Sequence, residues 1–193
     1  AFMPSKFVFP GGAVDDQDLS IDIKKSINDV CKKRLLKENE NGPWNALVAA
    51  AIRELFEETG QIIGLEQEWP KPPSSWIDFA KTGYVPDASK MFFVFRAITP
   101  PGRPRRFDAR FFLIQAEELQ TNLDDFSMAS DELSHLQWIP LTDTKNFDLP
   151  FITQVVLAEI SGNLKNSGPP AQVPFFQNTT EESLIYYINE DEN

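Results

Sequence analysis

Three carboxylates at close spacing on one predicted helix are the residues of this sequence best suited to chemistry. They are Glu54, Glu57 and Glu58, within the segment Arg-Glu-Leu-Phe-Glu-Glu-Thr-Gly at 53–60. At about 100° per residue, the three side chains fall within an arc of about 100° on one helix face. Such carboxylates repel one another, whereas a hard cation such as Mg²⁺ or Mn²⁺ takes oxygen ligands of this kind. The spacing therefore indicates a site for a divalent metal.

A simpler interpretation competes with this one, because acidic helix faces are often only solvated. Arg53 lies four residues before Glu57 and is placed to steady that carboxylate. The turn Pro10-Gly11-Gly12 lies upstream, within the segment Phe-Pro-Gly-Gly-Ala-Val-Asp at 9–15. Alone it is an ordinary turn, but its glycines also allow the backbone to approach the helix and a ligand closely.

The two segments together resemble the Nudix box, written G-x5-E-x7-R-E-U-x-E-E-x-G-U with U aliphatic. Gly12 matches the opening glycine, and the second half is matched by Arg53, Glu54, Leu55, Glu57, Glu58 and Gly60. The resemblance extends over roughly residues 3–160. It implies an α+β fold, an α/β/α sandwich with a mixed sheet. It also implies a hydrolase in which bound Mg²⁺ or Mn²⁺ assists the attack of water on phosphorus in a nucleoside diphosphate derivative.

The resemblance assigns a role to each matched residue. The expected metal ligands are Glu54, Glu57 and Glu58, with Glu57 and Glu58 the principal pair and Glu54 a ligand or a group that orients water. Gly11 and Gly12 are expected at the substrate. Arg53 and Gly60 are expected to be structural.

Three departures from the pattern distinguish this chain. The sixth residue after Gly12 is Asp18 where the box has Glu, and 34 residues rather than seven separate it from Arg53. Gln61 replaces the final aliphatic residue. An insertion inside the box is a feature of the peroxisomal coenzyme A diphosphatases and their bacterial relatives, and the run from Ile98 to Phe112 is also similar to that branch. Coenzyme A or its thioesters are therefore the favoured substrate class.

The general base has two equal candidates. Glu132, in Ser-Asp-Glu-Leu at 130–133, resembles a downstream acidic residue that several Nudix hydrolases use, and Glu54 is the other contender. With Glu57 they form the expected catalytic set. The single histidine, His135, is expected to be structural or exposed.

A cluster of arginines offers the cations that a diphosphate substrate needs. Arginine forks match phosphate oxygens, and four arginines lie within eight residues, at 103, 105, 106 and 110. Alternate residues of a strand point to opposite faces. Arg106 and Arg110 share one parity and are the expected substrate-binding pair.

Hydrophobic spacing predicts the elements that must position these residues. Strands are expected at 6–9, 91–98, 107–115 and 136–139. Helices are expected at 21–36, 44–59 and 149–164, with a short one near 75–81. For the helix at 44–59, Asn45 is a candidate N-cap and Gly60 the C′ residue that ends it. The polar stretch 37–43 is a linker, and 65–90 is an irregular excursion.

These elements fit one Nudix-type domain over 1–164, with a helical insertion at 19–44. The Pro-rich and then acidic tail, 165–193, is expected to pack loosely. Because the chain starts with Ala1 and reaches Gly11 almost at once, we expect one or more N-terminal strands to be missing from it.

Composition narrows the class of protein. A chain of 193 residues fits one domain, and 29 acidic against 18 basic residues give a net charge of −11, which disfavours nucleic-acid binding. There is no secretory signal and no apolar run long enough for a membrane span. Cys31 is the only cysteine, so an internal disulfide is excluded and a cytoplasmic setting is expected. The expected partner is a small nucleotide diphosphate, and a homodimer is compatible with the resemblance.

Three alternative functions remain open from the sequence. Within the same enzyme class, the substrate is ADP-ribose or a sugar nucleotide. In a second class, the domain senses a nucleotide without cleaving it, which Asp18 and the long insertion would favour. In a third, the acidic helix binds nothing.

Overall fold

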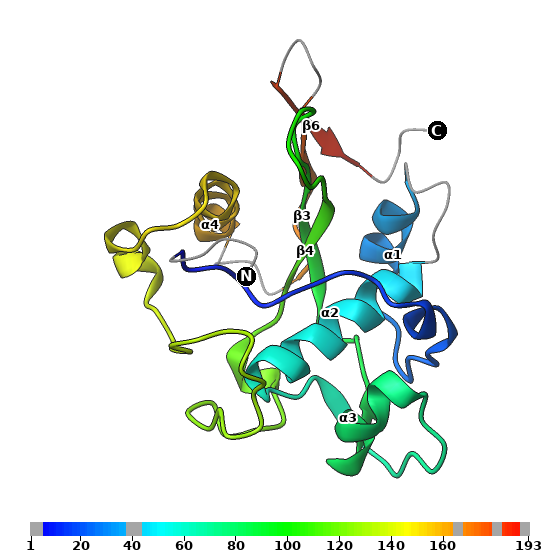
Figure 1. The fold of residues 1–193 in the computed structure, drawn as a ribbon. Helices are drawn as coiled ribbons and strands as arrows, with labels where there is room; N and C mark the ends of the chain where they lie inside the picture. The colour runs from blue at the N-terminus through cyan, green and yellow to red at the C-terminus, as the bar shows by residue number, and fades with distance from the viewer. Residues whose placement is uncertain (1–5, 38–43, 164–167, 179–182, 190–193) are drawn as a thin grey trace.

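A mixed β-sheet forms the centre of the computed structural model, which describes residues 6–37, 44–163, 168–178 and 183–189 (Figure 1). Within those residues the sheet has four strands in the order β4-β3-β5-β6. Their bounds are Phe92–Ile98 for β3, Asp108–Leu113 for β4, Val173–Asn178 for β5 and Ser183–Ile188 for β6. β3 pairs antiparallel with β4 and parallel with β5, and β5 pairs antiparallel with β6.

Helices cover both faces of this sheet. Helix α1 (Asp29–Leu36) and helix α2 (Trp44–Thr59) lie on one side, and helix α4 (Phe151–Asn163) lies on the other (Figure 1). Two hydrophobic clusters correspond to these two interfaces: α1 and α2 contribute to the larger one, and α4 to the smaller one. The expected α+β class and α/β/α sandwich with a mixed sheet are therefore confirmed.

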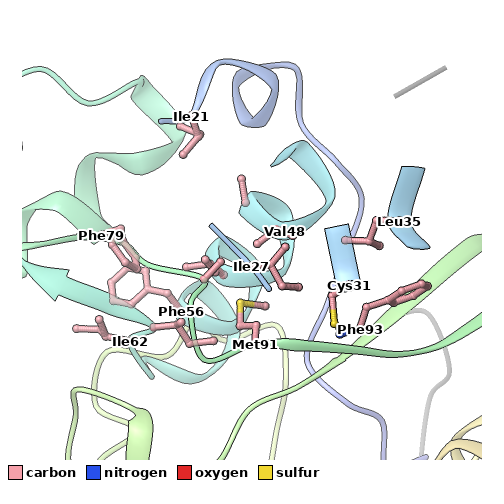
Figure 2. Packing of buried hydrophobic residues seen from close by; sticks show 14 of the residues in the cluster. Ile21, Ile27, Cys31, Leu35, Val48, Phe56, Ile62, Phe79, Met91 and Phe93 are labelled. Carbon is pink, nitrogen blue, oxygen red and sulfur yellow. Dashed lines mark hydrogen bonds between the residues drawn. The ribbon is translucent and has the colours of Figure 1, made fainter. Parts of the chain in front are cut away.

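The larger core fixes α2, the helix that carries the acidic residues. Val48 and Phe56 of α2 pack in one cluster with Cys31 of α1 and Phe93 of β3 (Figure 2). Val48 and Cys31 are fully buried. Because α2 is held on its apolar stripe, its remaining face is presented in one fixed orientation.

Short elements surround these layers. The strands β1 (Gly64–Glu66) and β2 (Tyr84–Pro86) form an antiparallel pair that the sequence analysis did not predict. Between them lie the 3-10 turn η2 (Ser74–Trp76) and helix α3 (Ile77–Lys81), close to the short helix expected there. Three further 3-10 turns are η1 (Asp16–Ser20), η3 (Ala116–Glu118) and η4 (Leu141–Asn146).

The predicted helix 44–59 is confirmed, and so is Gly60 as the residue that ends it. Gly60 has φ +74, and its N–H donates to Phe56 O at 2.7 Å. The expected N-cap was wrong: Asn45 lies inside the helix, and its side-chain Nδ2 donates to Leu19 O at 3.4 Å instead. The prediction failed because the helix already begins at Trp44.

Other predicted boundaries also need correction. The helix expected at 21–36 begins only at Asp29, because the side chain of Asn28 caps it by accepting from Val30 N at 2.9 Å. The strand expected at 6–9 is absent, and Phe7 N donates a backbone hydrogen bond to Asp148 O at 3.0 Å instead. The segment 136–139 is also irregular rather than a strand. Most of the predicted linker, residues 38–43, lies outside the described residues.

The C-terminal segment is the largest correction. Instead of packing loosely, residues 173–178 and 183–188 form β5 and β6. β5 lies in the interior of the sheet beside β3, and Phe175 on it is only 1% exposed. A Pro-rich, acidic composition suggested weak packing, but the continuous apolar runs at 173–176 and 184–188 match strands of a covered sheet. No helix among the described residues has the length and apolar character to cross a membrane.

Truncating Phe175 is therefore expected to destabilise the protein severely. Its ring lies 4.7 Å from that of Tyr186, and the guanidinium of Arg96 lies 4.2 Å from its centroid. We expect Phe175→Ala to lower the free energy of unfolding by about 3–5 kcal/mol, as for other buried Phe residues. Urea unfolding followed by circular dichroism measures this. The control is Ile185→Ala on β6, which is 55% exposed and should cost less than about 1 kcal/mol. Equal losses in the two variants would contradict an integral role for β5.

Candidate active site

An ion pair between Asp18 and Arg53 joins the two halves of the split motif. Arg53 Nη2 lies 3.0 Å from Asp18 Oδ2, and Arg53 Nε donates to Asp18 Oδ1 at 3.1 Å. The side chain of Asp18 is 0% exposed and that of Arg53 is 7% exposed. Asp18 also accepts from the N–H of Asp15 at 2.8 Å within the capping box of η1. The Asp that departs from the expected Glu is thus the direct partner of the arginine on α2.

Arg53 distributes its remaining hydrogen bonds over the rest of the site. Its Nη1 donates to Glu54 Oε1 and to Glu57 Oε2, both at 2.9 Å, and its Nη2 donates to Ala13 O at 2.9 Å. Burial alone would lower the pKa of Arg53, but the hydrogen bond to Asp18 and the charges of its three acidic partners raise it above its ordinary value. Arg53 therefore stays charged and contacts Asp18, Glu54 and Glu57 together, and its expected structural role stays a prediction.

Glu58 is the buried member of the acidic group. It is 6% exposed, and one carboxylate oxygen accepts from Gly11 N at 2.6 Å. Burial raises its pKa to about 7, against the bond from Gly11, and the neighbouring charges of Glu54, Glu132 and Glu57 add to the rise. Glu58 is therefore an acid close to its titration point near neutral pH, without a cationic side chain among the causes of its shift.

Glu57 lies at the rim, with a side chain 40% exposed. Burial raises its pKa, the Arg53 cation lowers it and the Glu54 charge raises it again, with a net rise. Because its Oε2 is held by Arg53 while the side chain stays accessible, Glu57 presents a fixed carboxylate to the surface.

Gly12 lies directly against the Glu54 carboxylate of the acidic helix. A Cβ at this position would lie 2.4 Å from the carboxylate carbon of Glu54. Gly11, with φ +152, donates its N–H to Glu58 as described. The structure thus brings both glycines onto the acidic face of α2, as the resemblance implied. Contact of either glycine with substrate stays a prediction.

Glu132, the expected base candidate, lies in a loop that is tied to the same helix end. Ser130 N donates to Glu57 O at 2.8 Å, and Glu132 N donates to Ser130 Oγ at 3.4 Å. Glu132 is exposed, and its charge contributes to the raised pKa of Glu58. The structure therefore brings Glu132 to the acidic group, but it does not distinguish Glu132 from Glu54 as the base.

The two arginines expected to bind substrate have different surroundings. Arg106 is exposed, and its Nε donates to Thr99 O at 3.2 Å. Arg110 is 8% exposed and paired with Asp108, Nη1 to Oδ2 at 3.0 Å, and burial lowers its pKa. Within the described part of the chain, neither one is hydrogen-bonded or ion-paired to the carboxylates of α2. Their role stays a prediction.

The sequence analysis missed one buried participant. Trp76 donates its Nε1–H to Asp18 Oδ1 at 3.1 Å, across 58 positions of the chain. Nothing in the spacing of the motif points to this residue. A tryptophan inside an otherwise polar, Pro-rich excursion was the available signal, because a buried indole needs an acceptor.

The acidic residues do not form a preassembled cage. Among the described residues, no three Asp, Glu, His or Cys side chains are arranged to hold a metal ion. One oxygen of each of Glu54 and Glu57 is held by Arg53, and one of Glu58 by Gly11. The donor chemistry nevertheless fits a hard divalent cation, since all three offer carboxylate oxygens and the raised pKa values of Glu57 and Glu58 record burial and mutual repulsion that a cation would relieve.

Comparison with known proteins supports the resemblance at the level of the superfamily. A protein of Caenorhabditis elegans named "Putative nudix hydrolase 7" is 27% identical over 151 residues, which are 72% of this chain and 42% of the relative. The chain thus spans less than half the length of this curated relative. The crystal structure of a NUDIX hydrolase from Alicyclobacillus acidocaldarius aligns with 87% of this chain and 85% of its own, at 20% identity and a TM-score of 0.47. The chain matches no model of a protein family.

The raised pKa of Glu58 predicts a pH-dependent loss of stability in the metal-free protein. The folded state binds a proton that the unfolded state releases between pH 4.5 and about 7, so the free energy of unfolding falls as pH rises through that window. Glu58→Gln removes this contribution and can still accept from Gly11. We expect the variant to gain on the order of 1–3 kcal/mol over the wild type between pH 5 and pH 8. Urea unfolding in EDTA measures it, and a difference that does not change with pH would contradict the assignment.

Proposed function

We propose that this chain is a Nudix-type hydrolase that uses Mg²⁺ or Mn²⁺ to cleave the diphosphate linkage of a nucleoside diphosphate derivative. The observation that carries the proposal is the fixed acidic face of α2. Arg53 of α2 holds Glu54 and Glu57, and the N–H of Gly11 holds Glu58 from outside the helix, while Asp18 holds Arg53 from η1. A merely solvated acidic face would have no need of a buried ion pair or of backbone hydrogen bonds from a distant loop.

The carboxylates have distinct proposed roles. Glu57 and Glu58 would hold the metal, with Glu54 as a further ligand or as the group that orients water. When bound, the metal would neutralise the diphosphate and polarise the attacked phosphorus. Glu54 or Glu132 would accept the proton of the attacking water. The oxygen of that water forms the new bond to phosphorus, and the bridging oxygen leaves with the other phosphoryl group.

Two arginines and the glycine-containing loop are the groups proposed to bind the substrate. Arg106 is exposed and is therefore the more accessible of the two predicted phosphate-binding arginines. Arg110 is already paired with Asp108, so contact with substrate would require Asp108 and the phosphate to share the Arg110 cation. Gly11 and Gly12 would let the substrate approach the backbone beside the acidic face.

Coenzyme A or its thioesters are the substrate class we favour, because of the insertion between Asp18 and Arg53 and the segment 98–112. ADP-ribose and sugar nucleotides are the second class. With a net charge of −11 the chain is not expected to bind nucleic acid, and we propose a small-molecule substrate in a cytoplasmic setting. A homodimer is compatible with this proposal.

Replacing the two principal carboxylates tests the proposal directly. We expect Glu57→Gln with Glu58→Gln to lower turnover by at least about 10²-fold, because removal of a charge-stabilising group at a catalytic centre commonly costs this much. The assay measures phosphate-containing products from coenzyme A, acyl-coenzyme A, ADP-ribose and a sugar nucleotide, with Mg²⁺, with Mn²⁺ and with EDTA. The matched control is Glu117→Gln, an exposed carboxylate on η3, which should leave turnover unchanged.

Two results would count against the proposal. Full activity in the doubly substituted variant would remove Glu57 and Glu58 from the mechanism. Tight binding of a nucleotide diphosphate in calorimetry, with no turnover over hours in Mn²⁺, would identify a sensing domain instead. A metal effect on the melting temperature separates both from a site that binds nothing, since a ligand of the folded state raises that temperature.

A further inference from the structure

A buried indole shares the carboxylate that holds Arg53. Asp18 Oδ1 accepts from Trp76 Nε1 at 3.1 Å and from Arg53 Nε at 3.1 Å. Both Asp18 and Trp76 are 0% exposed. The indole N–H is a donor only, so its single hydrogen bond fixes one oxygen of the carboxylate in direction as well as in distance. Trp76 therefore acts on the same atom that orients Arg53.

The neighbouring residue of η1 is bound to the same turn. Gln17 Nε2 donates to Ser74 Oγ at 2.7 Å, and Gln17 Oε1 accepts from Ser75 N at 3.0 Å and Ser75 Oγ at 3.1 Å. Two consecutive residues of η1 are thus attached to three consecutive residues of η2. Such a double attachment fixes the rotation of η1 as well as its position.

Trp76 is in turn anchored to the helix that carries the site. Its ring lies 5.7 Å from that of Trp69 and 5.2 Å from that of Phe79. Phe79 packs edge-on against Phe56 of α2, with centroids 5.3 Å apart. The aromatic contacts connect η2 to α2 through the core. Both η1 and α2 are therefore attached to the segment 74–79.

The attachment of η1 to residues 74–76 compensates for the shorter side chain of Asp18. Asp is shorter than Glu by one methylene, roughly 1.5 Å, so with Asp18 in place of Glu the backbone of η1 must lie closer to Arg53 for the ion pair to form. The contacts of residues 74–76 with Gln17 and Asp18 hold η1 at that shorter distance. Without them, the register between the two halves would depend on the ion pair and on the hydrogen bonds of Gly11, Ala13 and Leu19 with α2.

We propose that Trp76 is a positioning residue for the acidic site, acting through Asp18 and Arg53 on the placement of Glu54 and Glu57. This inference rests on the proposed function for its kinetic part. Outer contacts of this kind commonly change metal affinity or activity by roughly 10- to 100-fold. Trp76 itself is buried and would touch neither substrate nor metal.

Trp76→Phe tests the inference, because it removes the N–H and keeps most of the apolar ring. We expect kcat to fall about tenfold with KM within about twofold of the wild type, and the Mg²⁺ concentration for half-maximal thermal shift to rise by a similar factor. The matched control is Trp69→Phe, a change in the same aromatic cluster at a residue with no hydrogen bond to η1 in the described structure. It should leave kcat and the Mg²⁺ shift unchanged.

The outcomes separate the inference from the function. Equal kcat and equal Mg²⁺ shifts in the two variants would overturn the role of Trp76 even if the wild type is active. A wild type without turnover would overturn the proposed hydrolase, while the Mg²⁺ shift still tests the positioning.

A second variant keeps the test valid if Trp76→Phe fails to fold. Gln17→Ala removes the other attachment at a partly exposed position and should lower kcat in the same direction by a smaller factor. Asp16→Ala, at an exposed neighbour, is its control and should have no effect. If Gln17→Ala matches Asp16→Ala, the attachment of η1 to η2 has no part in positioning the site.

Discussion

Asp18 and Arg53 lie 35 positions apart in the sequence and form a buried ion pair on which the geometry of the acidic site depends. A buried charge without a partner is strongly unfavourable, so neither residue can leave without destabilising the other. Because Arg53 also holds Glu54, Glu57 and the carbonyl of Ala13, the pair fixes the glycine-containing loop and the carboxylates together. The inserted segment with α1 packs in the larger core and returns the chain to this contact.

The same arrangement leaves negative charge in excess. Asp18, Glu54 and Glu57 share the cation of Arg53, and Glu58 accepts from the N–H of Gly11, its one hydrogen-bond partner among the described residues. Burial and the neighbouring carboxylates therefore raise the pKa values of Glu57 and Glu58. A bound divalent cation would offset the same repulsion and allow both carboxylates to ionise. Proton and metal are therefore expected to compete at Glu58, which connects the stability of the protein to the chemistry proposed for it.

Local patterns predicted what local forces determine. The helix at 44–59 and its end at Gly60 follow from apolar periodicity and from a glycine with positive φ. The strands β3 and β4 follow in the same way. The sequence analysis failed where long-range pairing decides: β5 and β6 were assigned to a loose tail, and residues 6–9, expected as a strand, pair with no strand among the described residues. At the site, the motif identified the acidic residues, but only the fold shows Asp18 as the partner of Arg53 and Trp76 as the donor behind it.

A double-mutant cycle on Asp18 and Arg53 tests the central claim most directly. Arg53→Gln leaves the buried Asp18 without a counter-charge and should lower the free energy of unfolding by about 3–5 kcal/mol. Asp18→Asn leaves Arg53 paired with Glu54 and Glu57 and should cost about 1–3 kcal/mol. The double variant leaves neither charge unpaired and should lose clearly less than the sum, with a coupling of about 2 kcal/mol or more, within the range of residues in direct contact. Additive losses, to within about 0.5 kcal/mol, would contradict the claim that this ion pair joins the two halves of the site.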